Sequence, residues 1–121
     1  RNFMINQVLK FIHSYWVIIT ISFAIIITIG SLSPIHVSLG SHDSDKLFHI
    51  TSYIALSFPV ALRASYNYVS ILICFVLFGS VIEVLQAYFN RNFELYDILA
   101  NTLGTFLGIF FADLIKKYYS Y

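Results

Sequence analysis

The sequence predicts an all-helical membrane protein, an antiparallel bundle of four transmembrane helices. Of its 121 residues, 59% are hydrophobic and 11% are charged, less than half the roughly 25% of charged residues usual in soluble domains. The apolar residues also fall into four runs near the ~20 residues that cross a bilayer. A chain of this length has room for one domain, so we expect 1–121 to form a single transmembrane unit.

Charge and cysteine content exclude several classes of function. The formal net charge is +1, and the seven Lys and Arg residues are scattered, which is unlike the basic patch of a nucleic-acid-binding protein. We therefore predict no nucleic-acid partner. The single cysteine, Cys74, lies inside an apolar run, so an internal disulfide or thiolate metal site cannot form.

The first apolar run, 15–32, is predicted to be a retained transmembrane helix. It is long enough to span a bilayer, and no small-residue cleavage pattern of a signal peptide follows it. The Ser33-Pro34 pair is expected to end this helix. Because the sequence starts at Arg1 rather than Met, we expect further residues to precede it.

The second run, 47–62, is the weakest candidate for a span. It is short, contains Pro59 and begins beside polar residues, so a re-entrant segment is the alternative. A full span is favoured because an irregular segment exposed to lipid cannot satisfy its own backbone polar groups. Hydroxyl and carboxylate side chains within 41–44 are expected to cap the start of this helix.

The third and fourth runs, 68–89 and 95–115, complete the bundle. Short connections predict that consecutive helices are antiparallel. This topology gathers five cations on the side of the two termini and leaves Lys46 and Arg91 on the other side; the five are Arg1, Lys10, Arg63, Lys116 and Lys117. Cytoplasmic loops carry the excess of Lys and Arg, so both termini are predicted to be cytoplasmic.

Polar residues gather where the second helix begins, the third ends and the fourth begins. All three ends are predicted to lie at the extracytoplasmic side. On the second helix, Asp45, His49 and Tyr53 recur every four residues and therefore share one face. The predicted ligand-binding set is Asp45, Lys46, His49, Tyr53, Glu83, Gln86, Arg91, Asp97 and Asn101.

This polar set has two interpretations. Each ionisable group inside a bilayer costs about 2.5 to 3.5 kcal/mol, so such groups face protein and find partners. For Glu83 the candidate partners are Lys46, His49 and Arg91. The set is either a hydrogen-bonded clasp between helices or a binding or catalytic site, and the concentration of ionisable groups at one end favours a site.

Small residues recur every four positions along the last helix. They are Ala100, Gly104, Gly108 and Ala112. Small residues let one helix backbone approach another closely in a membrane, so this stripe is predicted to serve helix packing.

The polar motifs, taken in order, resemble those of the VanZ-like family of small membrane proteins. The resemblance covers 45–108 and rests on three motifs: Asp45-Lys46-x-x-His49-x-x-x-Tyr53, Glu83-x-x-Gln86, and Arg91 followed by Asp97-x-x-x-Asn101-x-x-Gly104-x-x-x-Gly108. It implies a cell-envelope role and a bacterial cytoplasmic membrane location. The best-known member is associated with lowered susceptibility to teicoplanin, a property that we do not transfer to this chain.

Three functional hypotheses follow. The favoured one is that the cluster binds an anionic or polyhydroxyl headgroup of a lipid or lipid-linked envelope precursor, through Lys46 and Arg91 and without a cofactor. The second is an enzyme acting on envelope lipids, with His49, Glu83 and Asp97 as metal ligands or as general acid and base. The third is an accessory or structural subunit that associates with itself or with other membrane subunits.

Catalysis is the less favoured alternative because the chain has no compact metal motif such as His-Glu-x-x-His. Proton passage is disfavoured as well. The carboxylates cluster at one end and do not form a series across the bilayer.

Overall fold

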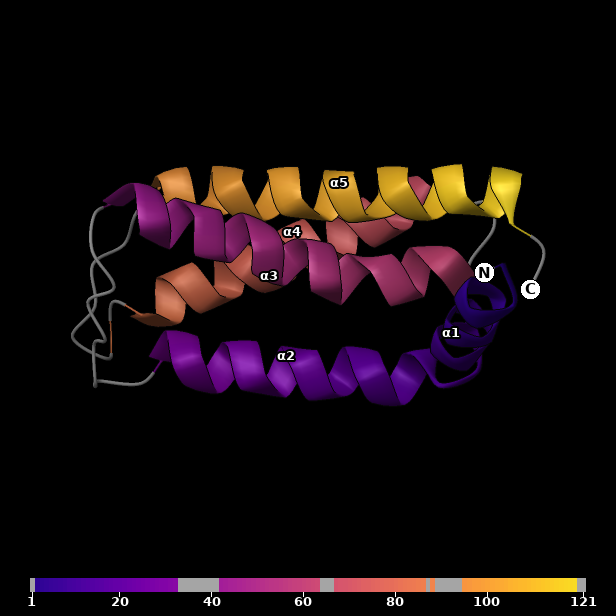
Figure 1. Ribbon diagram of the computed structural model, residues 1–121. Coiled ribbons are helices and arrows are strands. Elements are labelled where there is room, and N and C mark those ends of the chain that lie inside the picture. Colours follow the sequence, from indigo (N-terminus) through magenta and orange to yellow (C-terminus); the bar gives the residue numbers. More distant parts are fainter. Residues whose placement is uncertain (1, 33–41, 64–66, 87, 89–94, 120–121) are drawn as a thin grey trace.

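The protein is entirely helical over the residues that its computed structural model describes, which are 2–32, 42–63, 67–86, 88 and 95–119. The five helices of this part are α1 (Asn2–Ser14), α2 (Trp16–Leu32), α3 (His42–Arg63), α4 (Tyr68–Gln86) and α5 (Leu95–Tyr118). The all-helical prediction is confirmed. Figure 1 shows α2 to α5 side by side, with consecutive helices running in opposite directions, and α1 lying across the end that carries both termini.

Helix boundaries differ from the predicted ones by more than one residue in three places. The third helix, α3, begins at His42 rather than at 47, so the segment expected to cap it lies partly inside its first turn. The fourth, α4, ends at Gln86 rather than at 89, and α5 continues to Tyr118 rather than stopping at 115. The predicted helix ends were placed where an apolar run meets polar residues. In the structure, a helix continues as long as its backbone hydrogen bonds continue.

The α1 helix was not predicted. Its Ile5, Leu9 and Ile12 follow the spacing of one helical face, and Leu9 is buried in the core at the terminal end of the bundle. Tyr15 follows α1 directly and is exposed, like Tyr118 at the end of α5. Aromatic side chains therefore lie at this end on two helices, as is common at a membrane interface.

By length and composition, two helices in the described ranges, α4 and α5, can each cross a membrane. A third crossing is added if α1 and α2, which meet at a bend of 75°, are taken together as one broken span. The predicted count of four spans is thus not reached by this criterion. The α2 helix alone has 17 residues, and α3 carries too many polar side chains.

The closest packing joins α3 to α5, which run in the same direction (Figure 1). A Cβ atom on Gly104 would collide with the backbone carbonyl of Ile50 and lie 2.9 Å from the Cβ of Tyr53. One turn later, a Cβ on Gly108 would collide with the Ser57 hydroxyl and lie 3.0 Å from the Ile54 carbonyl oxygen. The two backbones approach this closely because glycine has no side chain.

Polarity changes along the bundle axis. The apolar core lies near the termini and consists of Leu9, Ala61, Leu62, Ile71, Ile109 and Ala112. Toward the opposite end the buried side chains include polar ones, first Ser57 and Thr105 and then Glu83, Gln86, Asp97 and Asn101. We call the end where α3 and α5 begin the site end.

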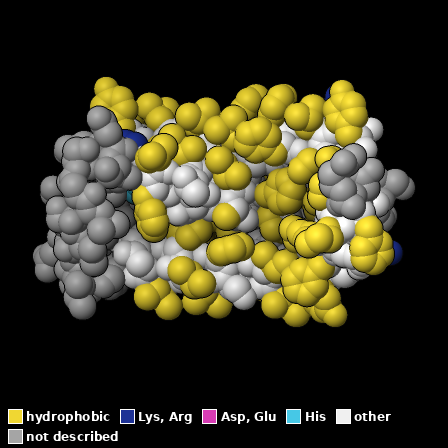
Figure 2. All heavy atoms as spheres, in the orientation of Figure 1, with side chains coloured by type: hydrophobic (Ala, Val, Ile, Leu, Met, Phe, Trp, Pro, Cys, Tyr) yellow, Lys and Arg dark blue, Asp and Glu magenta, His cyan; other side chains and the backbone are white. Residues whose placement is uncertain are grey.

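The outer surface between the two ends is apolar. Large hydrophobic side chains are exposed on every helix, for example Ile21 on α2, Leu77 on α4 and Phe106 on α5. Figure 2 shows them spread over the visible face, with Lys and Arg near its ends. A surface of this kind is energetically unfavourable in water and suited to lipid, so the protein is a membrane protein.

Candidate functional site

A lysine and an aspartate join α3 and α5 near the starts of the two helices. The Nζ atom of Lys46 lies 2.7 Å from Oδ1 of Asp97, and the side chain of Lys46 is 22% exposed while that of Asp97 is 6% exposed. The two helices start at the same end and run in parallel, so residues near their N-termini meet. Asp97 also lies in the first turn of α5, where the helix dipole favours a negative charge.

His49 lies one turn further along α3 and contacts the same helix. Its Nδ1 atom is 2.9 Å from Oδ1 of Asn101, and its Nε2 atom is 3.6 Å from Oδ2 of Asp97. A carbonyl oxygen can only accept, so Nδ1 carries the proton of this hydrogen bond. In the neutral ring, Nε2 then holds the lone pair and faces the carboxylate.

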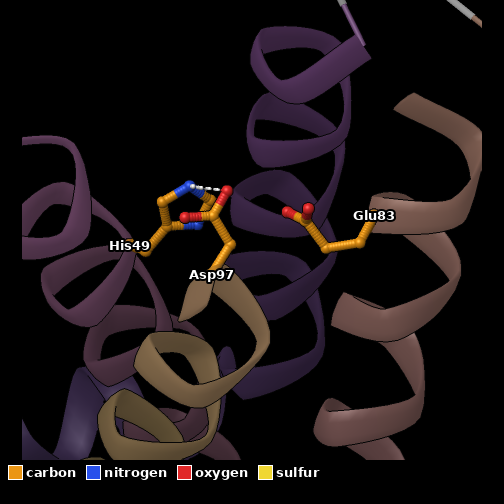
Figure 3. Close-up of side chains that lie close together, drawn as sticks. All are labelled: His49, Glu83 and Asp97. Atoms are coloured by element: carbon orange, nitrogen blue, oxygen red, sulfur yellow. Dashed lines mark ion pairs between the residues drawn. The ribbon is translucent and has the colours of Figure 1, made fainter. Parts of the chain in front are cut away.

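Glu83 brings a second carboxylate from α4. Its side chain is completely buried, and Figure 3 shows the carboxylate turned toward Asp97, with His49 on the far side of Asp97. One ligand atom from each of His49, Glu83 and Asp97 lies within 4.8 Å of the others. We call these three residues the triad; they come from three different helices.

A glycine on α4 makes room for the base of the site. A Cβ atom on Gly79 would lie 2.8 Å from Nδ2 of Asn101 and 3.2 Å from the hydroxyl oxygen of Tyr53. Tyr53 is itself buried, with its ring centroid 6.3 Å from that of Phe78. The close approach of α4 at Gly79 therefore encloses Tyr53 and Asn101 directly beneath the triad.

The family of the chain follows from a comparison with protein-family models. A model described as VanZ/LLP1 matches residues 2–116, which includes every residue of the site. The chain belongs to the VanZ/LLP1 family. This membership confirms the resemblance found in the sequence motifs. No match to the chain is found among the curated proteins or among the solved structures.

The three polar motifs found in the sequence meet in space, although they are separated along the chain. Lys46, His49, Glu83, Asp97 and Asn101 form one connected cluster, with Tyr53 packed beneath it. The side chain of Asp45 and the whole of Arg91, both in the predicted set, lie outside the described residues.

Gln86 takes a different position from the one that sequence spacing suggested. Its Nε2 donates a hydrogen bond of 3.0 Å to the backbone carbonyl of Ser31, so it links α4 to the last turn of α2. Carbonyls in the last turn of a helix lack intrahelical donors, and this one accepts a hydrogen bond from Gln86.

Two residues of this region were missed in the sequence. The single hydroxyl proton of Ser57 is shared between the carbonyls of Tyr53, at 2.8 Å, and Thr105, at 3.2 Å. Ser57 continues the four-residue spacing of His49 and Tyr53. Gly79 lies four residues before Glu83 and so shares its face of α4. The sequence spacing of each residue could have indicated its position, but neither serine nor glycine is by itself indicative of a site.

Proposed function

We propose that this VanZ/LLP1 chain crosses a bacterial cytoplasmic membrane four times, through α2 to α5, with both termini in the cytoplasm. Two of the polar side chains of α3, Tyr53 and Ser57, are turned inward, since both are buried. Inward-facing polar residues do not oppose insertion as lipid-facing ones do. At about 1.5 Å per residue, the 17 residues of α2 extend ~26 Å, close to the ~30 Å hydrocarbon core.

Cysteine labelling tests this topology. Each variant carries one cysteine in a Cys74→Ser background, and its reaction with a membrane-impermeant maleimide shows on which side of the membrane that position lies. The substitutions are Phe3→Cys, Val37→Cys, Asn67→Cys, Tyr88→Cys and Ser120→Cys. We expect the variants at 37 and 88 to react in intact cells and the other three to react after permeabilisation. Equal reactivity at 37 and 67 would show that α3 does not cross.

We further propose that the site end binds the anionic or polyhydroxyl headgroup of a membrane lipid or lipid-linked envelope precursor. The observation that carries this proposal is the position of Lys46. Its side chain is 22% exposed, beside the buried Asp97, at the end of a bundle whose sides are apolar. An ammonium group has three donors, and a cation at the membrane surface attracts anionic headgroups.

A shallow apolar groove on the outer surface of the bundle offers a place for an acyl chain. It runs between α2 and α4 and is lined by Ile21, Ala24, Ile25, Thr28, Ile29 and Phe78. Phe78 also contacts Tyr53 beneath the triad, and the Gln86 to Ser31 hydrogen bond joins α2 and α4 at the site end. A lipid with its headgroup at Lys46 would therefore have apolar protein surface beside its tail.

Lipid retention by a pair of lysine variants tests headgroup binding. Removing one cation near a membrane surface weakens attraction to an anionic lipid by about 1 kcal/mol, which is roughly fivefold in affinity. We expect Lys46→Gln to retain about fivefold less phosphatidylglycerol than the wild type in native mass spectrometry. Retention of phosphatidylethanolamine should change less.

Lys117→Gln is the matched control. Lys117 also faces an aspartate, at 3.6 Å from Asp113, but it lies at the opposite end of the bundle. If both lysine variants lose the same amount of phosphatidylglycerol, or if neither does, then the site end has no specific affinity for anionic headgroups and the proposal is wrong.

A further inference from the structure

We propose that the triad of His49, Glu83 and Asp97 binds a divalent transition-metal ion, Zn²⁺ before others. One imidazole and two carboxylates converge from α3, α4 and α5, and their ligand atoms lie within 4.8 Å of one another. This inference does not depend on headgroup binding, because it concerns the triad and not the partly exposed side chain of Lys46.

The distances fit a shared ion. Zn²⁺ binds nitrogen and carboxylate oxygen at about 2.0 to 2.2 Å in tetrahedral geometry, which places two ligand atoms ~3.4 Å apart. His49 Nε2 and Asp97 Oδ2 are 3.6 Å apart. The three ligand atoms lie within 4.8 Å of one another, so the widest pair has to close by up to ~1.4 Å to reach this tetrahedral spacing. A glutamate such as Glu83 can make that shift by side-chain rotation.

Neighbouring side chains orient two of the three ligands, His49 and Asp97. Metal-binding histidines donate their other ring N–H to a carbonyl or carboxylate, which fixes the tautomer and the ring orientation. His49 does this through Nδ1 to Asn101, at 2.9 Å, and Nε2 is left to face Asp97. Lys46 contacts Oδ1 of Asp97 at 2.7 Å, while Oδ2 faces the imidazole. Asn101 and Lys46 are thus positioning residues.

The charges favour a cation. With both carboxylates ionised, Glu83 and Asp97 carry two negative charges against the single positive charge of Lys46, so these side chains and a neutral His49 sum to −1. Imidazole nitrogen suits Zn²⁺, whereas Mg²⁺ and Ca²⁺ prefer sites made of oxygen ligands alone. Three protein ligands leave a fourth position of a tetrahedral ion for water or another oxygen ligand, as in catalytic zinc sites.

Metal titration of the purified full chain tests the proposal. After treatment with a chelator in detergent, the wild type is expected to bind one Zn²⁺ per chain by elemental analysis, and Zn²⁺ should raise its thermal midpoint where equal Mg²⁺ does not. Co²⁺ should give a visible absorption band that Zn²⁺ abolishes. Loss of an outer partner weakens metal binding by about 10 to 100-fold, so we expect that range for Asn101→Ala and a larger loss for Glu83→Gln.

Asp113→Asn and His13→Gln are the controls, since they remove an aspartate and a histidine at the terminal end of the bundle and should leave Zn²⁺ affinity unchanged. The proposal is overturned if the wild type binds less than one equivalent, or if Glu83→Gln and Asn101→Ala bind Zn²⁺ as the wild type does. If Glu83→Gln does not fold, Asn101→Ala and the Co²⁺ spectrum of the wild type decide. A triad that serves as a clasp between helices predicts no metal in any of these proteins.

Discussion

Gly104→Ala is expected to lower the stability of the protein by about 3 kcal/mol, near the upper end of the range for overpacked cores. The added methyl group would collide with the backbone carbonyl of Ile50 and lie 2.9 Å from Cβ of Tyr53. Neither atom can move without moving α3, because both belong to or adjoin its backbone. Thermal unfolding in detergent, followed by size-exclusion chromatography, measures the loss.

Gly30→Ala is the control for this substitution. Gly30 is also helical, but a Cβ atom there has nothing within 4 Å. Alanine is favoured over glycine inside a helix by about 1 kcal/mol, so this variant should be as stable as the wild type or slightly more so. Equal losses in the two variants would mean that close contact of α3 and α5 does not contribute to stability.

Asp97→Asn is expected to lower the free energy of unfolding by about 2 to 3 kcal/mol. The double variant Lys46→Met with Asp97→Asn should recover most of that loss. Breaking a buried ion pair costs about 3 to 5 kcal/mol because one charge remains without its partner. We expect less here because Lys46 is 22% exposed and can turn its ammonium toward water. A double-mutant cycle on thermal or denaturant unfolding gives the coupling energy.

The exposed pair at the other end of the bundle is the reference for this cycle. Asp113 and Lys117 are 3.6 Å apart, with side chains 43% and 64% exposed. Such pairs contribute at most about 1 kcal/mol, so Asp113→Asn should be close to neutral. A coupling for Lys46 and Asp97 no larger than this one would contradict the view that the site end depends on its charges for stability.

The sequence predicted the class, the helices near the site and the family. Long apolar runs and few charges predicted an all-helical membrane protein, and α2 and α4 begin within one residue of the predicted starts. The four-residue spacing of His49 and Tyr53, and of Asp97 and Asn101, correctly assigned each pair to one helix face, because helical geometry is local.

The number of crossings depends on more than the length and composition of the helices. Length and composition support two or three spans, since polar residues on α3 lower its hydropathy whether they face lipid or protein. Which way they face is a property of the packed bundle. The amphipathic α1 was missed for a related reason: a short helix is stabilised mainly by its packing, here through Leu9.

By itself, then, the sequence determined what each helix could present: an apolar surface to lipid, a stripe of small residues on α5 and polar groups at one end. The tertiary structure alone decided which faces meet. It paired α3 with α5 as parallel neighbours through Gly104 and Gly108, turned Gln86 toward α2 and brought Glu83 to His49 and Asp97. Periodicity defines the faces of a helix, but the partner of each face depends on contacts between residues far apart in the chain.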